Sequence, residues 1–192
     1  MIHLSQARSS IIFSHDGDSL EILYWGKKLG AIDEKSAAAI SAARTKPAFH
    51  GGLDVAPGNL ILREHARGWI GHPALRGHRG GVNAANAFNL KSAVQKDQSI
   101  VAIFVDPIAG LEIEITYTLT PSDILLMDAT LTNTADGDYF LDHFLYWLPL
   151  AEQADEVLDF YGHWTKERQP QRRSIDYGLI TREGFEGRSG HD

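Results

Sequence analysis

Short runs of alternating hydrophobic and polar residues recur along this chain of 192 residues, with the two-residue period of a β-strand. In LEIEITYTLT, every second residue from Leu111 to Leu119 is apolar or aromatic, and the residues between them are glutamate or threonine. This pattern is typical of an antiparallel strand with one buried face. The next run, ILLMDATLTN, follows a Pro-Ser-Asp turn and has the same period. Its predicted buried face holds Leu125, Met127, Ala129 and Leu131.

Further runs predict more strands and the turns between them. SIVAIFVD and LEILYWG are short, apolar and rich in β-branched or aromatic residues. YFLDHFLYWLPL is apolar on both faces, which predicts a central strand covered on both sides. Asp136-Gly137 in NTADGDY predicts a hairpin turn between the runs on either side of it. Short strands and frequent turns predict an all-β sandwich.

One segment has the character of a helix rather than a strand. AIDEKSAAAISAARTK is rich in alanine, and Asp33 stands where an N-cap residue would accept a backbone hydrogen bond. Pro47 and the Gly51-Gly52 pair follow and predict the end of the helix. We therefore expect one short helix near residues 33–45 in a single β-sandwich domain spanning residues 1–192.

Composition and charge exclude several classes of protein. The net charge of −7 is unlike that of a duplex-binding domain, and the one dense basic run, Lys166 to Arg173, is interpreted as a solvated or interface loop. We therefore expect no nucleic-acid partner. The absence of cysteine removes disulfides, zinc–thiolate sites and thiol nucleophiles, and it fits a reducing compartment. No run approaches the roughly 20 apolar residues of a membrane helix, and no signal peptide is recognisable, so we expect a cytoplasmic protein without a membrane partner.

The common catalytic patterns are missing. Two aspartate pairs, Asp16 with Asp18 and Asp136 with Asp138, lie in turn-like, glycine-containing sequence where aspartate usually serves local hydrogen bonds. No histidine pair has the i, i+4 spacing of metal ligands on a helix, and there is no nucleophile elbow or phosphate-binding loop. We therefore expect no catalytic residue, no metal site and no cofactor.

The most informative segment for function is RGWIGHPALRGHRGG, residues 67–81. It places Trp69 beside Arg67 and His72 in a glycine-rich stretch. An indole can cover the apolar face of a sugar while charged groups hydrogen-bond its hydroxyls, so we take Trp69, Arg67 and His72 as candidate substrate-binding residues. The alternative is that Trp69 closes one end of the sandwich and has no ligand.

The C-terminal region contains YGHWTKERQPQRR and YGLITREGFEGRSGHD, with WLPLAEQADEVLDFYG before them and RGWIGHPALRGHR further upstream. In this order, these stretches resemble the segment that bacterial family 36 α-galactosidases carry before their catalytic barrel. The positions that match the family pattern are Gly162, Trp164, Glu167, Arg168, Gln171, Arg172, Gly187, Arg188, Ser189, Gly190 and His191.

This resemblance implies a β-supersandwich similar to galactose mutarotase, here incomplete, which would precede a (β/α)₈ barrel. In the family the barrel supplies the two catalytic aspartates, one of them in a Lys/Arg-Trp-Asp motif. None of the four tryptophans here is followed by aspartate, so the barrel is expected to be absent from this chain. The family's N-terminal loop reads Gly-Asp-Phe-Arg-x-Pro and reaches an active-site mouth. Aligning Gly68 and Pro73 with it puts Trp69 at the Asp position and Gly71 at the Arg position.

The resemblance implies the N-terminal domain of a retaining α-galactosidase that hydrolyses terminal α-galactosides of the raffinose or melibiose type. Such a domain would shape the substrate mouth and the interface of a homo-oligomer, would need the barrel as its partner, and would be inactive alone. Three alternatives stay open: a free-standing carbohydrate-binding module, an oligomerisation module, and a mutarotase-like epimerase. The residues considered for the epimerase are Glu64 or Glu167 with His65 or His78.

Overall fold

The computed structural model describes residues 1–44, 58–82, 84–150, 153–176 and 178–182. The chain divides into two compact units, Met1–Pro149 and Leu150–Asp192. The assignment of residues 1–192 to one domain stays a prediction. Strands dominate both units, and the described residues contain a single α-helix, so the predicted all-β class is confirmed.

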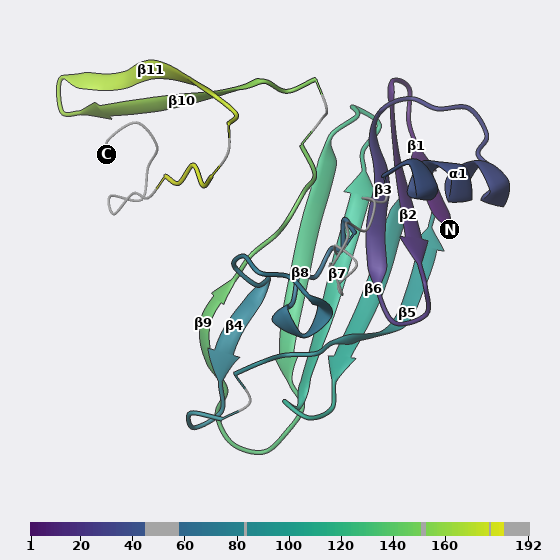
Figure 1. The fold of residues 1–192 in the computed structure, drawn as a ribbon, viewed down its shortest axis with the longest axis vertical. Helices are drawn as coiled ribbons and strands as arrows, with labels where there is room; N and C mark the ends of the chain where they lie inside the picture. Colours follow the sequence, from purple (N-terminus) through teal and green to yellow (C-terminus); the bar gives the residue numbers. More distant parts are fainter. Residues whose placement is uncertain (45–57, 83, 151–152, 177, 183–192) are drawn as a thin grey trace, which may run out of the picture. The chain divides into compact units, whose positions relative to one another are not determined.

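Two antiparallel sheets form the body of the first unit (Figure 1). One sheet has three strands in the order β1-β2-β3, and the other has four in the order β5-β6-β7-β8. Each strand pairs with the next one along the chain, so short turns make the connections within each sheet. The strands are β1 (Ile2–Ser5), β2 (Ser9–His15), β3 (Leu20–Lys27), β5 (Asn89–Lys96), β6 (Ser99–Asp106), β7 (Leu111–Leu119) and β8 (Leu125–Asn133).

The main hydrophobic core lies between these two sheets. Strand β7 buries every second residue from Leu111 to Leu119, as its alternation predicts, while the face of β8 that begins with Leu125 is half-buried. The three-stranded sheet contributes a matching apolar face, and the rings of Phe13 and Tyr117 meet across the core with centroids 5.1 Å apart. Burial of such large side chains on both faces makes the sandwich the main source of stability.

Helix α1 (Glu34–Arg44) covers the outer side of the three-stranded sheet. The Asp33 carboxylate accepts a hydrogen bond from the Ser36 backbone N–H at 2.8 Å, which confirms the predicted N-cap. Ala37 packs with Ile12 and Leu23 in a small second core. The predicted stop signals, Pro47 and Gly51-Gly52, lie outside the described residues. Within the described ranges, no helix is both long enough and apolar enough to span a bilayer.

A third, two-stranded sheet corrects two of the predictions. Strand β9 (Phe140–Phe144) pairs only with β4 (Leu75–His78) among the described strands. Phe140 and Leu141 are about half exposed, so the prediction that 139–150 is a strand covered on both sides is wrong for this unit. The prediction of a hairpin at Asp136-Gly137 is also wrong, because β8 pairs with β7 and the turn leads into a different sheet.

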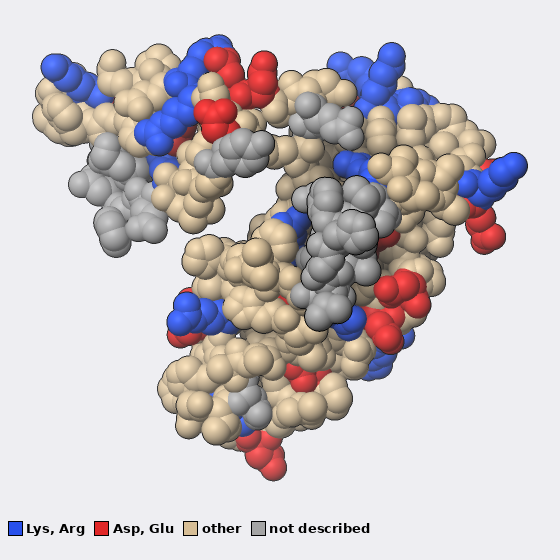
Figure 2. Space-filling model, in the orientation of Figure 1, with Lys and Arg blue, Asp and Glu red and all other residues tan. Residues whose placement is uncertain are grey.

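The second unit contains one antiparallel hairpin, β10 (Glu156–His163) with β11 (Lys166–Ser174). The basic run from Lys166 to Arg173 is therefore a strand rather than a loop, although nearly all of its side chains are exposed. Figure 2 shows basic and acidic side chains interspersed in this unit, and Arg172 pairs with Glu156 at 3.0 Å. No described residue of this unit is buried, which is unusual because a lone hairpin is marginally stable in water.

Asp123 joins the two large sheets at their turns. It has a left-handed backbone conformation (φ 63°) in the turn between β7 and β8. Its carboxylate accepts hydrogen bonds from the backbone N–H of Arg8 and Ser9 and, at 2.7 Å, from the Ser9 hydroxyl. The bond from the Ser9 hydroxyl, followed by that from the Arg8 backbone, lowers the pKa of Asp123. The ionised carboxylate therefore holds the β1–β2 turn in place.

We expect Asp123→Asn to lower the thermal unfolding midpoint by a few degrees at pH 7. Because the pKa is lower in the folded state, the carboxylate's stabilisation is fully present above its unfolded-state pKa of about 3.9. It is lost as the pH falls through the folded-state pKa, so the difference between wild type and variant should shrink at pH 3. Scanning calorimetry at both pH values measures this. Asp97→Asn is the matched control, since Asp97 is also a left-handed turn residue (φ 52°). An equal difference at both pH values would contradict the assignment.

Candidate functional site

The candidate functional site is the loop of residues 63–74, which we call the Trp69 loop. In chain order it comes directly before β4, and it contains one short 3₁₀ turn, His65–Arg67. The Ala74 backbone N–H donates to the Arg63 carbonyl at 2.7 Å, so the two ends of the loop are joined. Gly68 ends the 3₁₀ turn with φ 81°, a conformation that favours glycine.

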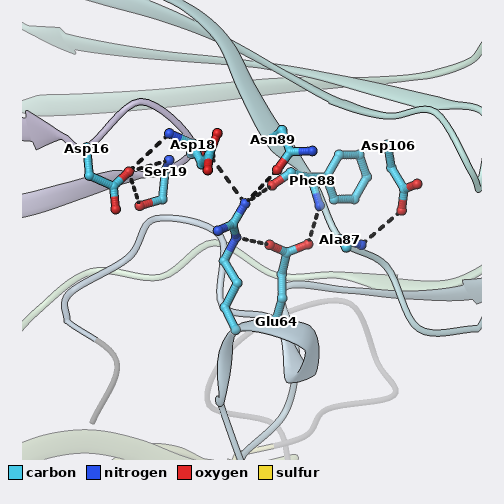
Figure 3. Close-up of polar contacts among 9 residues, drawn as sticks. Asp16, Asp18, Ser19, Glu64, Ala87, Phe88, Asn89 and Asp106 are labelled. Carbon is cyan, nitrogen blue, oxygen red and sulfur yellow. Dashed lines mark hydrogen bonds and ion pairs between the residues drawn. The ribbon is translucent and has the colours of Figure 1, made fainter. Parts of the chain in front are cut away.

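Glu64 anchors the loop to the sandwich (Figure 3). Glu64 is 5% exposed, and its carboxylate accepts hydrogen bonds from the Phe88 backbone N–H at 2.8 Å and from Arg67 Nε at 3.1 Å. Burial raises the pKa of Glu64, and the bonds from Phe88 and Arg67 oppose that rise. Since a buried polar group is costly without partners, these bonds make the position of the loop specific.

Arg67 is directed toward the sandwich in this unit. One of its terminal nitrogens donates to the Phe88 carbonyl at 2.6 Å, to the Asn89 side-chain oxygen at 3.0 Å and to the Asp18 carbonyl at 3.3 Å (Figure 3). It therefore links the loop to the start of β5 and to the turn between β2 and β3. The assignment of Arg67 as a sugar ligand stays a prediction, and it would require some of these bonds to be exchanged.

Asp106 fixes the segment near Phe88 to which Glu64 and Arg67 are bonded. Its side chain is almost fully buried at the end of β6 and accepts a hydrogen bond from the Ala87 backbone N–H at 2.9 Å. The same carboxylate accepts from the N–H groups of Ile108 and Ala109, which closes the turn into β7. The segment that receives Glu64 and Arg67 is thus itself fixed to the four-stranded sheet.

Trp69 is the half-exposed centre of the loop, outside the buried core of the described residues. Its indole Nε1–H donates to the His72 carbonyl at 2.8 Å, and the Arg63 guanidinium lies over its ring at 4.0 Å from the centroid. A side chain on Gly71 would begin only 2.8 Å from Cζ2 of the indole, so the ring needs glycine there. The His72 carbonyl and Gly71 therefore fix the edge of the indole, and the Arg63 guanidinium covers its face.

His72 is the third predicted residue, and the structure brings it close to Trp69 through its backbone rather than its ring. The His72 ring is exposed and lies 6.4 Å from that of His143, edge to face. His143 in turn hydrogen-bonds the Pro73 carbonyl at 3.1 Å. Trp69 and His72 are thus neighbours on an exposed loop, and their roles as sugar ligands stay predictions.

A small cavity lies behind the loop, bordered by Glu64, His65, Asn86 and Phe88. Its volume of about 20 Å³ has room for a water molecule but not for a sugar ring. Asn86 is buried beside this cavity, and its side chain interacts with that of Tyr139. Glu64 and His65 therefore do not flank a space that an epimerase of sugars could use. Elsewhere in the described part of the chain, no three acidic or histidine side chains are arranged to hold a metal ion.

Arg63 and Trp147 also belong to this site, although nothing in the sequence pattern points to either of them. The Arg63 guanidinium lies 3.6 Å from the ring centroid of Trp147 as well as 4.0 Å from that of Trp69. Arg63 is distant from Trp147 in the chain, so no local spacing in the sequence reveals their contact. Glu64 and Arg67 left a weak signal, since they have the i, i+3 spacing of an ion pair within one turn.

Comparison with known families gives a match over residues 18–192 to the glycosyl hydrolase family 36 N-terminal domain. The chain belongs to this family. An α-galactosidase of Escherichia coli is 32% identical over 189 residues, which are 98% of this chain and 26% of that protein. The family 36 chain described here thus spans about a quarter of the length of this relative.

Solved structures agree on the fold. The crystal structure of the α-galactosidase AgaA from Geobacillus stearothermophilus matches with a TM-score of 0.70 and 17% identity, covering 92% of this chain and 28% of that one. A variant of AgaA in complex with raffinose matches with a TM-score of 0.69 and 17% identity, covering 91% and 28%. These likenesses confirm the predicted sandwich fold of a family 36 N-terminal domain.

Replacing Glu64 by alanine tests the anchor of the Trp69 loop. We expect Glu64→Ala to reduce the free energy of unfolding by about 3 kcal/mol, because it leaves a partly buried arginine and a buried N–H without their acceptor. Urea denaturation followed by circular dichroism measures the change. Glu112→Ala is the control, because Glu112 pairs with Lys91 at the surface and should cost less than about 1 kcal/mol. Equal losses in the two variants would argue against a special role for Glu64.

Proposed function

We propose that this chain is the N-terminal domain of a retaining α-galactosidase that works in the cytoplasm on terminal α-galactosides of the raffinose or melibiose type. The observation that carries the proposal is the match of residues 18–192 to the family 36 N-terminal domain, supported by the alignment of 98% of this chain with 26% of the Escherichia coli α-galactosidase. The raffinose bound to the structurally similar AgaA variant supports the substrate class. The absence of cysteine is compatible with the cytoplasm.

The chemistry of such an enzyme assigns the domain a supporting role. Retaining glycosidases need a nucleophilic carboxylate and an acid/base carboxylate about 5–5.5 Å apart on either side of the scissile bond. Among the described residues of the first unit, the buried carboxylates are those of Glu64 and Asp106, and both are occupied by backbone or arginine donors. We therefore assign both catalytic carboxylates to a barrel outside this chain, and to this domain the shaping of the substrate mouth and of a homo-oligomer interface.

Trp69 is the residue we assign to the substrate. The loop presents a half-exposed indole whose Nε1–H is already engaged, so stacking on the apolar face of a galactosyl ring is the contact left to it. His72 lies beside it with an exposed ring that can hydrogen-bond a hydroxyl. One stacked face and few hydrogen bonds predict weak binding, in the millimolar range of about −4 kcal/mol.

The first test is an assay of hydrolysis. We expect this chain alone to release no nitrophenol from p-nitrophenyl α-galactoside above the buffer rate, because it lacks the two carboxylates. The product of the complete reading frame, read beyond codon 192, should be active and should contain a Lys/Arg-Trp-Asp strand. Hydrolysis by the chain alone that a carboxylate substitution abolishes would contradict the proposal, as would a stop codon directly after Asp192.

The second test addresses Trp69. We expect raffinose to shift the indole N–H signal of Trp69 in ¹H–¹⁵N spectra, with saturation in the millimolar range, and we expect Trp69→Ala to abolish saturable binding. Trp164→Ala is the matched control, since Trp164 is 77% exposed in the hairpin of the second unit. That variant should bind as the wild type does. Unchanged spectra at high raffinose concentration would remove Trp69 from the substrate site.

A further inference from the structure

The Arg63 guanidinium lies between two indole rings, those of Trp69 and Trp147. The distances to the ring centroids are 4.0 Å and 3.6 Å, which are well within the range of cation–π attraction. Arg63 opens the Trp69 loop, whereas Trp147 follows β9 at the far end of the unit's sequence. This stack therefore joins the loop to a segment about 80 residues away in the chain.

The surroundings of Arg63 leave it few interactions other than these rings. Its Nε is buried without a hydrogen-bond partner, and none of the ion pairs formed by described residues includes it. Burial lowers the pKa of Arg63 to about 10, so the side chain still carries its charge at neutral pH. A partly desolvated cation of this kind is held mainly through the planes of the two indoles.

The segment that carries Trp147 is itself attached to the loop. The Leu145 backbone N–H donates to the Ala74 carbonyl at 2.7 Å, and the His143 ring bonds the Pro73 carbonyl. Trp147 thus packs against the Arg63 guanidinium from a fixed position, and the guanidinium packs against the face of the Trp69 ring. The edge of the Trp69 ring is set separately, by the His72 carbonyl and by Gly71.

We propose that Arg63 is a positioning residue, which together with Trp147 holds the Trp69 indole in the orientation needed to stack on a galactoside ring. The inference rests on the proposed function of Trp69. An indole that already has its bound orientation loses less conformational freedom when the sugar binds, so a fixed ring binds more tightly than a mobile one. Arg63 does not need to touch the sugar in order to have this effect.

The test uses the four indole N–H signals of the chain. Arg63→Met keeps an unbranched, flexible stem close to the length of the aliphatic part of arginine and removes the charge and the planar group. We expect it to shift or broaden the signals of Trp69 and Trp147 and to leave those of Trp25 and Trp164 unchanged. It should also weaken raffinose binding at least threefold. Arg63→Lys should bring the indole signals and the raffinose affinity part of the way back to their wild-type values, because lysine also carries a cation. Arg76→Met is the matched control, since Arg76 pairs with exposed Asp142 on the same small sheet.

An unchanged Trp69 signal in Arg63→Met would overturn the proposal, and so would a shifted signal with wild-type raffinose affinity. If the wild type shows no raffinose binding but Trp69 responds to Arg63→Met, the sugar role of Trp69 fails while the positioning of its ring by Arg63 stands. Trp147→Phe provides a second variant if Arg63→Met does not fold. It should shift the Trp69 signal through Arg63, and an unchanged signal would again contradict the proposal.

Discussion

The apolar layer between the three-stranded and four-stranded sheets is the interaction on which the rest of the first unit depends. It buries the inward faces of β2, β3, β6 and β7, and the contact of Phe13 with Tyr117 lies within it. The Trp69 loop has no comparable core of its own. It is attached to the edge of this layer by polar contacts, chiefly those of Glu64, and the segment that receives these contacts belongs to the sandwich. Exposed binding residues on a rigid scaffold are a common arrangement in β-sandwich proteins.

The parts of the fold that local physics determines could be predicted from the sequence. The alternation from Leu111 to Leu119 and the Asp33 cap are examples, because strand period and capping depend on neighbouring residues. Pairing between distant segments could not be predicted in this way. Asp136-Gly137 has the composition of a hairpin turn, yet tertiary contacts direct the following strand to β4. The apolar segment 139–150 predicts cover on both faces, yet its strand belongs to a two-stranded sheet of this unit, with Phe140 and Leu141 about half exposed.

The same limit applies to the candidate site. Trp69 and His72 are recognisable as candidates because an aromatic residue among glycines and basic residues is visible in a short stretch of sequence. Arg63 was not found, since its importance comes from Trp147, which only the folded chain places beside it. Arg67 stays a candidate ligand, but the structure shows in addition that its guanidinium is bonded to the sandwich. The sequence does not show this, because it does not distinguish a guanidinium that faces solvent from one that faces backbone carbonyls. Long-range contacts thus separate anchoring residues from exposed ones.

The contact between the Trp69 ring and the backbone at Gly71 limits which substitutions this loop can accept. With the indole in its present place, no side chain fits at position 71, whereas a smaller residue at position 69 would open that space. The order of two changes therefore matters, because a side chain can enter at position 71 only after the ring at position 69 has moved or has been replaced. Glycine at position 71 is thus the condition for tryptophan at position 69.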